Sequence, residues 1–122
     1  MENIPKILLI DNDRDNLDAM SLVLRFNKYR TYSFLNGDHL IERTRAIVPD
    51  MLIIDVLLGA EDGRDLCRQI KSTPDICHIP ILIISANKSL LCPMDCQAEG
   101  SIEKPFNIDH LFNMIDAHLL VH

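Results

Sequence analysis

The chain has 122 residues, a formal net charge of −6 and 48% hydrophobic residues. This length is typical of one domain, and the composition excludes a wholly disordered or low-complexity chain. The acidic balance gives no basic surface for nucleic acid, so we expect no direct binding to it. No apolar run is long enough to cross a bilayer, and the N-terminal residues lack the basic region of a signal peptide. We therefore expect a cytoplasmic protein that does not bind membranes.

Five short apolar runs predict five β-strands. They are residues 6–10, 31–35, 51–55, 81–85 and 100–103. The first, third and fourth are almost continuously apolar, which is typical of strands covered on both faces. The second and fifth are weaker, so we expect them at the edges of the sheet.

Helical patterns separate these runs. In the first, Leu17, Met20, Val23 and Leu24 form one amphipathic stripe, which we assign to the core, and Asp13 or Asp15 can cap the helix. The later predicted helices are residues 38–46, 65–72, 90–98 and 108–120. Pro93 interrupts the pattern of residues 90–98, and Asn107 is the expected N-cap of the last helix.

Alternating strands and helices indicate an α/β fold, in which a parallel sheet is covered by helices on both faces. Ligands of such sheets bind beyond the carboxyl ends of the strands. Residues 11–13 (Asp-Asn-Asp), Asp55, Ser85 and Lys104 stand at these ends. The acids suit Mg²⁺, while the lysine and the hydroxyl suit phosphate oxygens. A carboxylate between the metal and the lysine could attack phosphorus and become an aspartyl phosphate.

In these motifs the chain resembles, over its whole length, the receiver domain of two-component response regulators, of the kind found in chemotaxis regulators. The matching segments are KILLIDND (6–13), PDMLIID (49–55), DG (62–63), PILIISA (80–86) and KPF (104–106). The resemblance implies one receiver domain over residues 1–122. It also implies a doubly wound, five-stranded parallel sheet with five helices and the flavodoxin-like strand order 2-1-3-4-5.

The resemblance also implies a role for each site residue. Asp55 would be the phospho-acceptor, and Ser85 and Lys104 would bind the phosphate and switch the domain. The implied Mg²⁺ ligands are Asp11, Asn12, Asp55 and the backbone carbonyl of Leu57. Ala86, Asn87 and a cis Pro105 would flank the site.

The same resemblance implies a signalling role rather than an enzymatic one. A sensor histidine kinase or a histidine phosphotransfer protein in a phosphorelay would supply the phosphoryl group. The phosphate would then reshape the face formed by the fourth helix, the fifth strand and the fifth helix. That face would act on an output partner or on a fused output domain.

Several residues depart from the usual receiver pattern. Asn12 replaces the second acid after the first strand, Gly59 replaces a common proline, and Gln97 replaces a common glycine. Ser101 stands where an aromatic switch residue is frequent. The segment from Ser85 to Lys104 is also short, so we expect a short or irregular fourth helix.

Parts of the sequence are also compatible with two other functions and with other roles for the cysteines. The chain could be a receiver-like docking module that takes no phosphate. It could also be a haloacid-dehalogenase-like phosphohydrolase with Asp11 as nucleophile and Asp13 as acid, although we prefer a capping role for Asp13. We interpret Cys67, Cys77, Cys92 and Cys96 as reduced thiols rather than as zinc ligands or disulfides.

Overall fold

The computed structural model describes residues 4–119, and within them five parallel strands form one sheet in the order β2-β1-β3-β6-β7. In that order the strands are Arg30–Phe34, Lys6–Ile10, Met51–Asp55, Ile81–Ser85 and Gly100–Glu103. Two further strands form a separate hairpin, so β6 and β7 are the fourth and fifth strands of this sheet. The observed order therefore corresponds to 2-1-3-4-5. The predicted fold is therefore confirmed, and β2 begins and ends one residue earlier than predicted.

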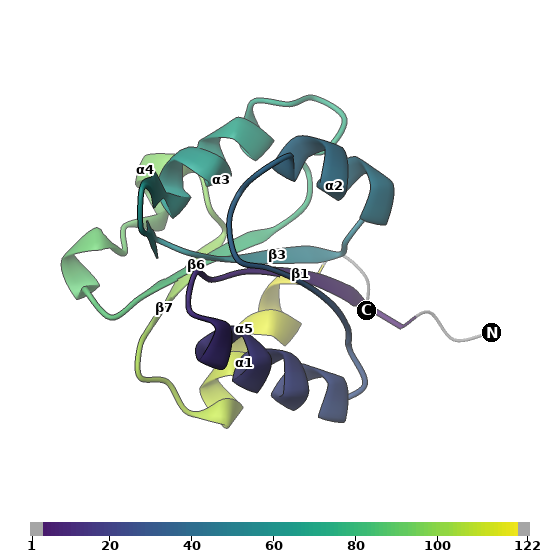
Figure 1. Cartoon of the computed structure of the whole chain (residues 1–122), viewed down its shortest axis with the longest axis vertical. Helices are drawn as coiled ribbons and strands as arrows, with labels where there is room; N and C mark the ends of the chain where they lie inside the picture. The colour runs from purple at the N-terminus through teal and green to yellow at the C-terminus, as the bar shows by residue number, and fades with distance from the viewer. Residues whose placement is uncertain (1–3, 120–122) are drawn as a thin grey trace.

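Helices cover both faces of the sheet (Figure 1). Helices α1 (Arg14–Phe26) and α5 (Ile108–His118) lie on one face, and α2 (Leu40–Ile47), α3 (Gly63–Lys71) and α4 (Pro93–Cys96) lie on the other. The predicted continuation of α5 to residue 120 lies outside the described residues. None of the helices between residues 4 and 119 combines the length and the apolar character that a membrane span requires.

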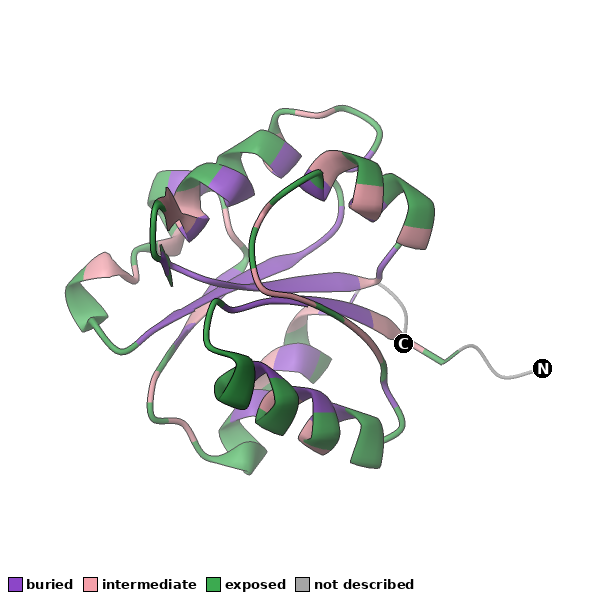
Figure 2. Ribbon diagram, viewed as in Figure 1, coloured by how far each residue is buried: buried purple, intermediate pink, exposed green. Residues whose placement is uncertain are grey.

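The apolar runs are continuous because each central strand contributes to two cores. Ile7 and Leu9 pack toward α1 and α5, whereas Leu8 and Ile10 pack toward α2 and α3. Every residue of β3 and β6 is buried, and Figure 2 shows buried strands between helices that are exposed on their outer faces. Successive side chains point to opposite faces, so burial on both sides favours an apolar residue at each position before the polar strand ends Asp55 and Ser85.

Helix α4 is short, as the length of the segment from Ser85 to Lys104 predicts, and it covers only part of the helical pattern of residues 90–98. A separate 3-10 turn, Lys88–Leu90, precedes the four-residue helix. Pro93 occupies the first turn of α4, where its missing N–H costs nothing. Gln97 ends the helix in the left-handed conformation, with φ of 65°, which is the conformation that favours glycine.

The starts of two other helices differ from the predictions by two residues. Helix α2 begins at Leu40 rather than at residue 38, because His39 has a left-handed backbone. Helix α3 begins at Gly63 rather than at residue 65, because Asp62 accepts a hydrogen bond from the Arg64 amide as N-cap.

A short hairpin between β3 and α3 was not predicted. Strands β4 (Leu57–Leu58) and β5 (Glu61–Asp62) pair antiparallel, and Gly59 in the turn has φ of 71°. Two-residue strands are too short to show a hydrophobic period. The hairpin begins two residues after Asp55, the predicted phospho-acceptor.

Candidate functional site

The carboxyl edge of the sheet collects the predicted site residues. Asp55 is the last residue of β3, Asp11 directly follows β1, and Lys104 directly follows β7. Strand β1 pairs with β3, β3 with β6, and β6 with β7, so the ends of these strands lie along one edge of the sheet. The parallel topology therefore brings together residues that are far apart in the sequence.

Lys104 lies between two carboxylates. Its Nζ is 2.7 Å from Asp55 Oδ2 and 3.1 Å from Asp11 Oδ2. The side chains of Asp11 and Asp55 are 7% and 8% exposed, and that of Lys104 is 20% exposed. One ammonium thus faces two nearly buried carboxylates, which leaves an excess of one negative charge.

Backbone amides hold the second oxygen of each carboxylate. The Asp13 amide donates to Asp11 Oδ1 at 2.9 Å, and the Leu57 amide donates to Asp55 Oδ1 at 3.0 Å. These bonds orient both carboxylates toward Lys104. The orientation of the two carboxylates therefore depends on the turns that follow β1 and β3.

Burial sets the electrostatics of the site. It raises the pKa of Asp55 above the usual value for aspartate, and hydrogen bonds from Lys104 and from the Leu57 amide offset this only in part. Burial acts to lower the pKa of Lys104, but its hydrogen bonds to Asp55 and Asp11 outweigh that effect and the pKa is raised. The net effect favours the charged form of Lys104, and its ammonium only partly offsets the cost of burying a charge on Asp55.

Ser85 and Lys104 are joined through the backbone. Ser85 is fully buried, and its carbonyl oxygen accepts a hydrogen bond from the Lys104 amide at 2.9 Å. Its Oγ accepts a hydrogen bond from the Asn87 amide at 3.0 Å. The peptide bond between Lys104 and Pro105 is cis, as the resemblance implies.

The remaining predicted residues lie around this centre and are more exposed. The side-chain amide nitrogen of Asn12 would lie 3.6 Å from a Cβ added to Gly59, so Asn12 is next to the β4–β5 turn. Leu57 is 54% exposed, and Ala86 is also exposed. Asn87 uses its side-chain oxygen to cap the 3-10 turn, accepting from the amide and the hydroxyl of Ser89.

Asp13 is engaged as a helix cap. Its Oδ1 accepts hydrogen bonds from the amides of Asp15 and Asn16, at 2.9 and 3.2 Å. The expected capping role is confirmed.

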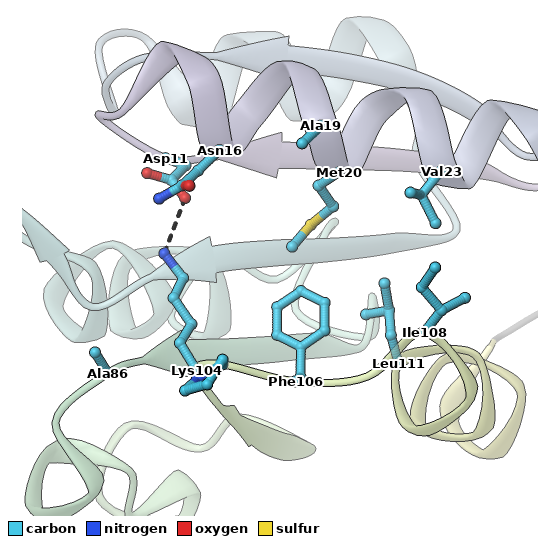
Figure 3. A pocket seen from close by; sticks show the side chains of 11 residues that line it. Asp11, Asn16, Ala19, Met20, Val23, Ala86, Lys104, Phe106, Ile108 and Leu111 are labelled. Atoms are coloured by element: carbon cyan, nitrogen blue, oxygen red, sulfur yellow. Dashed lines mark hydrogen bonds and ion pairs between the residues drawn. The ribbon is translucent and has the colours of Figure 1, made fainter.

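Sequence reasoning missed a cavity beside Lys104. Met20 packs against the core as predicted, but it also lines this cavity together with Val23 and Phe106 (Figure 3). Two weak signals in the sequence could have indicated the cavity. One is the irregular spacing of apolar residues along α1, and the other is the phenylalanine that follows Lys104 and Pro105. Leu17 and Leu24 of the same stripe are buried as predicted.

The comparisons with known proteins agree with this geometry. The sequence model of the response regulator receiver domain matches residues 7–116. The chain belongs to the response regulator receiver family. Proteins of this family take a phosphoryl group on an aspartate, generally bind Mg²⁺ at that site and interact with histidine kinases. The chain is thus a receiver domain of two-component signal transduction.

Individual relatives of this receiver include the response regulator MprA of Mycobacterium leprae (strain TN). It is 32% identical over 117 residues, which cover 93% of the receiver and 50% of MprA. The chain therefore spans about half the length of the curated relatives it matches.

Solved structures share the same fold. The signal receiver domain of a signal transduction histidine kinase from Syntrophus aciditrophicus has a TM-score of 0.84 and 25% identity. The match covers 94% of this receiver and 89% of the Syntrophus chain. Chemotaxis protein CheY4 of Vibrio cholerae has a TM-score of 0.86 and 20% identity, covering 96% and 100% of the two chains.

The raised pKa of Asp55 predicts a pH-dependent stability in metal-free buffer. Between the usual aspartate pKa and the raised value, the folded receiver holds a proton that the unfolded chain has lost. Stability must then fall as pH rises through that window. Urea midpoints measured with a chelator from about pH 4 to about pH 8 test this. Asp55→Asn should gain stability relative to wild type as pH rises, and parallel curves would contradict the prediction.

Proposed function

We propose that Asp55 of this receiver accepts the phosphoryl group. The main observation that supports this proposal is that Lys104 Nζ contacts the carboxylates of both Asp55 and Asp11 at the carboxyl edge of the sheet. A phosphoryl group on Asp55 would bring new negative charge beside Lys104, and a lysine ammonium is a common phosphate partner. The leaving group of the donor would depart on the side of phosphorus opposite to Asp55.

Ser85 would respond to the phosphate. Its hydroxyl accepts from the Asn87 amide at 3.0 Å and has a proton to donate to a phosphoryl oxygen. Movement of Ser85 would be passed to β7 through the Lys104 amide, which is bonded to the Ser85 carbonyl. We infer that the output face consists of α4, β7 and α5.

The donor set fits a divalent cation. Two nearly buried carboxylates share one lysine, and the raised pKa of Asp55 indicates that its charge is incompletely balanced. Hard oxygen ligands with one or two carboxylates suit Mg²⁺. We propose Asp11, Asn12, Asp55 and the Leu57 carbonyl as its ligands, and bound Mg²⁺ would neutralise charge on the phosphoryl oxygens.

Restoring the second acid should tighten Mg²⁺ binding. Asn12→Asp replaces a neutral amide with a carboxylate, and we expect on the order of tenfold higher affinity by calorimetric titration. The added repulsion should also lower the urea midpoint in metal-free buffer. Asn113→Asp on the exposed side of α5 adds the same charge away from the site and serves as control. Equal or weaker affinity in Asn12→Asp would exclude Asn12 as a ligand.

Phosphorylated Asp55 should be long-lived. Hydrolysis needs a water in line with the departing carboxylate, and Leu57, two residues after Asp55, cannot hold one. The Asn87 oxygen is already used in capping the 3-10 turn. Leu57→Asn should speed the decay on the order of tenfold, because its amide can position a water. Leu57→Ile is the apolar control, and decay of Leu57→Asn at the wild-type rate would refute this role.

The partners follow from the same proposal. A sensor histidine kinase or a histidine phosphotransfer protein supplies the phosphoryl group in the cytoplasm, and the receiver acts as acceptor rather than as an enzyme. Its output partner or output domain binds the α4-β7-α5 face. Direct binding to nucleic acid or to membranes is not part of this role.

Incubation with acetyl phosphate and Mg²⁺ tests the proposal. Intact-mass measurement should show the addition of one phosphoryl group, and a chelator should prevent it. A chain that takes no phosphoryl group from acetyl phosphate, or from a panel of purified histidine kinases, would instead be a docking module.

A further inference from the structure

A cavity of about 440 Å³ opens beside Lys104, between α1 and the segment that joins β7 to α5 (Figure 3). Its size lies within the range of small-molecule pockets. Asp11, Asn16 and Lys104 form one end of it. Beyond that end, its lining residues are uncharged and almost entirely apolar.

The walls of the apolar part of the cavity come from α1, from the connection after β7 and from α5. Met20 and Phe106 face one another across it, and Val23 and Leu111 lie farther along (Figure 3). Leu111 is buried in the core shared by α1 and α5, so the cavity floor is part of that core. An apolar group that enters would remove this surface from water, which is favourable.

The polar end of the cavity is shared with the phosphorylation site. Lys104 lines the cavity while its Nζ contacts Asp55 at 2.7 Å. Ala86, next to the buried Ser85, also lines it. A molecule with its apolar body in the cavity and its polar end at Lys104 would therefore place that end next to Asp55.

We propose that this cavity receives the acyl group of an acyl phosphate donor. The receiver then takes a phosphoryl group faster from acyl phosphates with an apolar group larger than acetyl, such as benzoyl phosphate. This inference rests on the proposed function of Asp55. It adds a donor preference, set by Met20, Phe106 and the space beside Ala19.

Transfer of the phosphoryl group from benzoyl phosphate to Asp55 requires no proton donor. A carboxylate oxygen of Asp55 forms a bond to phosphorus, and the bond between phosphorus and the acyl oxygen breaks. The electron pair leaves with the benzoate. Lys104 and the Asn16 amide, at the polar end, can donate hydrogen bonds to that carboxylate.

The test compares the phosphorylation rates from benzoyl phosphate and from acetyl phosphate, followed by intact mass with Mg²⁺ present. Ala19→Phe fills the cavity from an exposed position of α1, so the fold should tolerate it. Met20→Ala removes apolar wall without adding bulk. Ala46→Phe, on exposed α2 across the sheet, is the matched control.

The ratio of the benzoyl to the acetyl rate should fall about tenfold in Ala19→Phe, as expected for losing the burial of part of a phenyl ring. It should fall in the same direction in Met20→Ala and stay at the wild-type value in Ala46→Phe. An unchanged ratio in Ala19→Phe and Met20→Ala, or an equal loss with both donors, would overturn the inference. Absence of labelling by acetyl phosphate in wild type would instead overturn the function of Asp55.

Discussion

Gly63→Ala should destabilise the receiver by about 3 kcal/mol, because there is no room for a methyl group at that position. A Cβ on Gly63 would lie well inside contact distance of the Asp55 carbonyl oxygen. It would also lie 2.8 Å from the Asp55 carbonyl carbon and 2.9 Å from Ile54 Cγ2. Two of these atoms belong to the backbone of β3, so relief requires the strand and α3 to separate. Urea unfolding measures the loss.

The same variant should also impair phosphorylation, since the displaced backbone carries Asp55, the proposed acceptor. Gly59→Ala, in the preceding β4–β5 turn, is the matched control. Among residues 4–119, a Cβ there would meet only the side-chain amide nitrogen of Asn12, at 3.6 Å. The expected cost is therefore that of the left-handed backbone, about 1 to 2 kcal/mol. If Gly63→Ala were as stable as Gly59→Ala, the close packing of α3 on β3 would be disproved.

The sheet could be predicted from the sequence because its signal is strong. Continuous apolar runs separated by helical stripes leave few arrangements other than a parallel sheet covered on both faces. The β4–β5 hairpin could not be predicted, since two residues show no period. The start of α2 was misplaced because the left-handed backbone of His39 has no signature in the sequence.

The site could be predicted in its centre and less well at its edges. Asp11, Asp55 and Lys104 stand at strand ends, and the topology brings strand ends together. The capping role of the Asn87 oxygen depends on the local 3-10 turn, and the cavity depends on how far α1 and α5 stand apart. Both are properties of packing rather than of a motif.

Asp55→Asn should abolish phosphorylation, the largest functional effect expected. Asparagine keeps the size of the side chain but lacks the carboxylate that attacks phosphorus. Asp13→Asn is the matched control at the same edge, because asparagine caps a helix as well as aspartate does. Asp13→Asn should be labelled like wild type. Full labelling of Asp55→Asn by acetyl phosphate would show that another residue is the acceptor.

The most direct test of the central claim is to map the phosphorylated residue chemically. Borohydride reduces an aspartyl phosphate to homoserine, and peptide mass spectrometry then locates the changed residue. After incubation with acetyl phosphate and Mg²⁺, homoserine should be found at position 55. Homoserine at position 11 would instead identify Asp11 as the nucleophile and contradict the account given for Asp55.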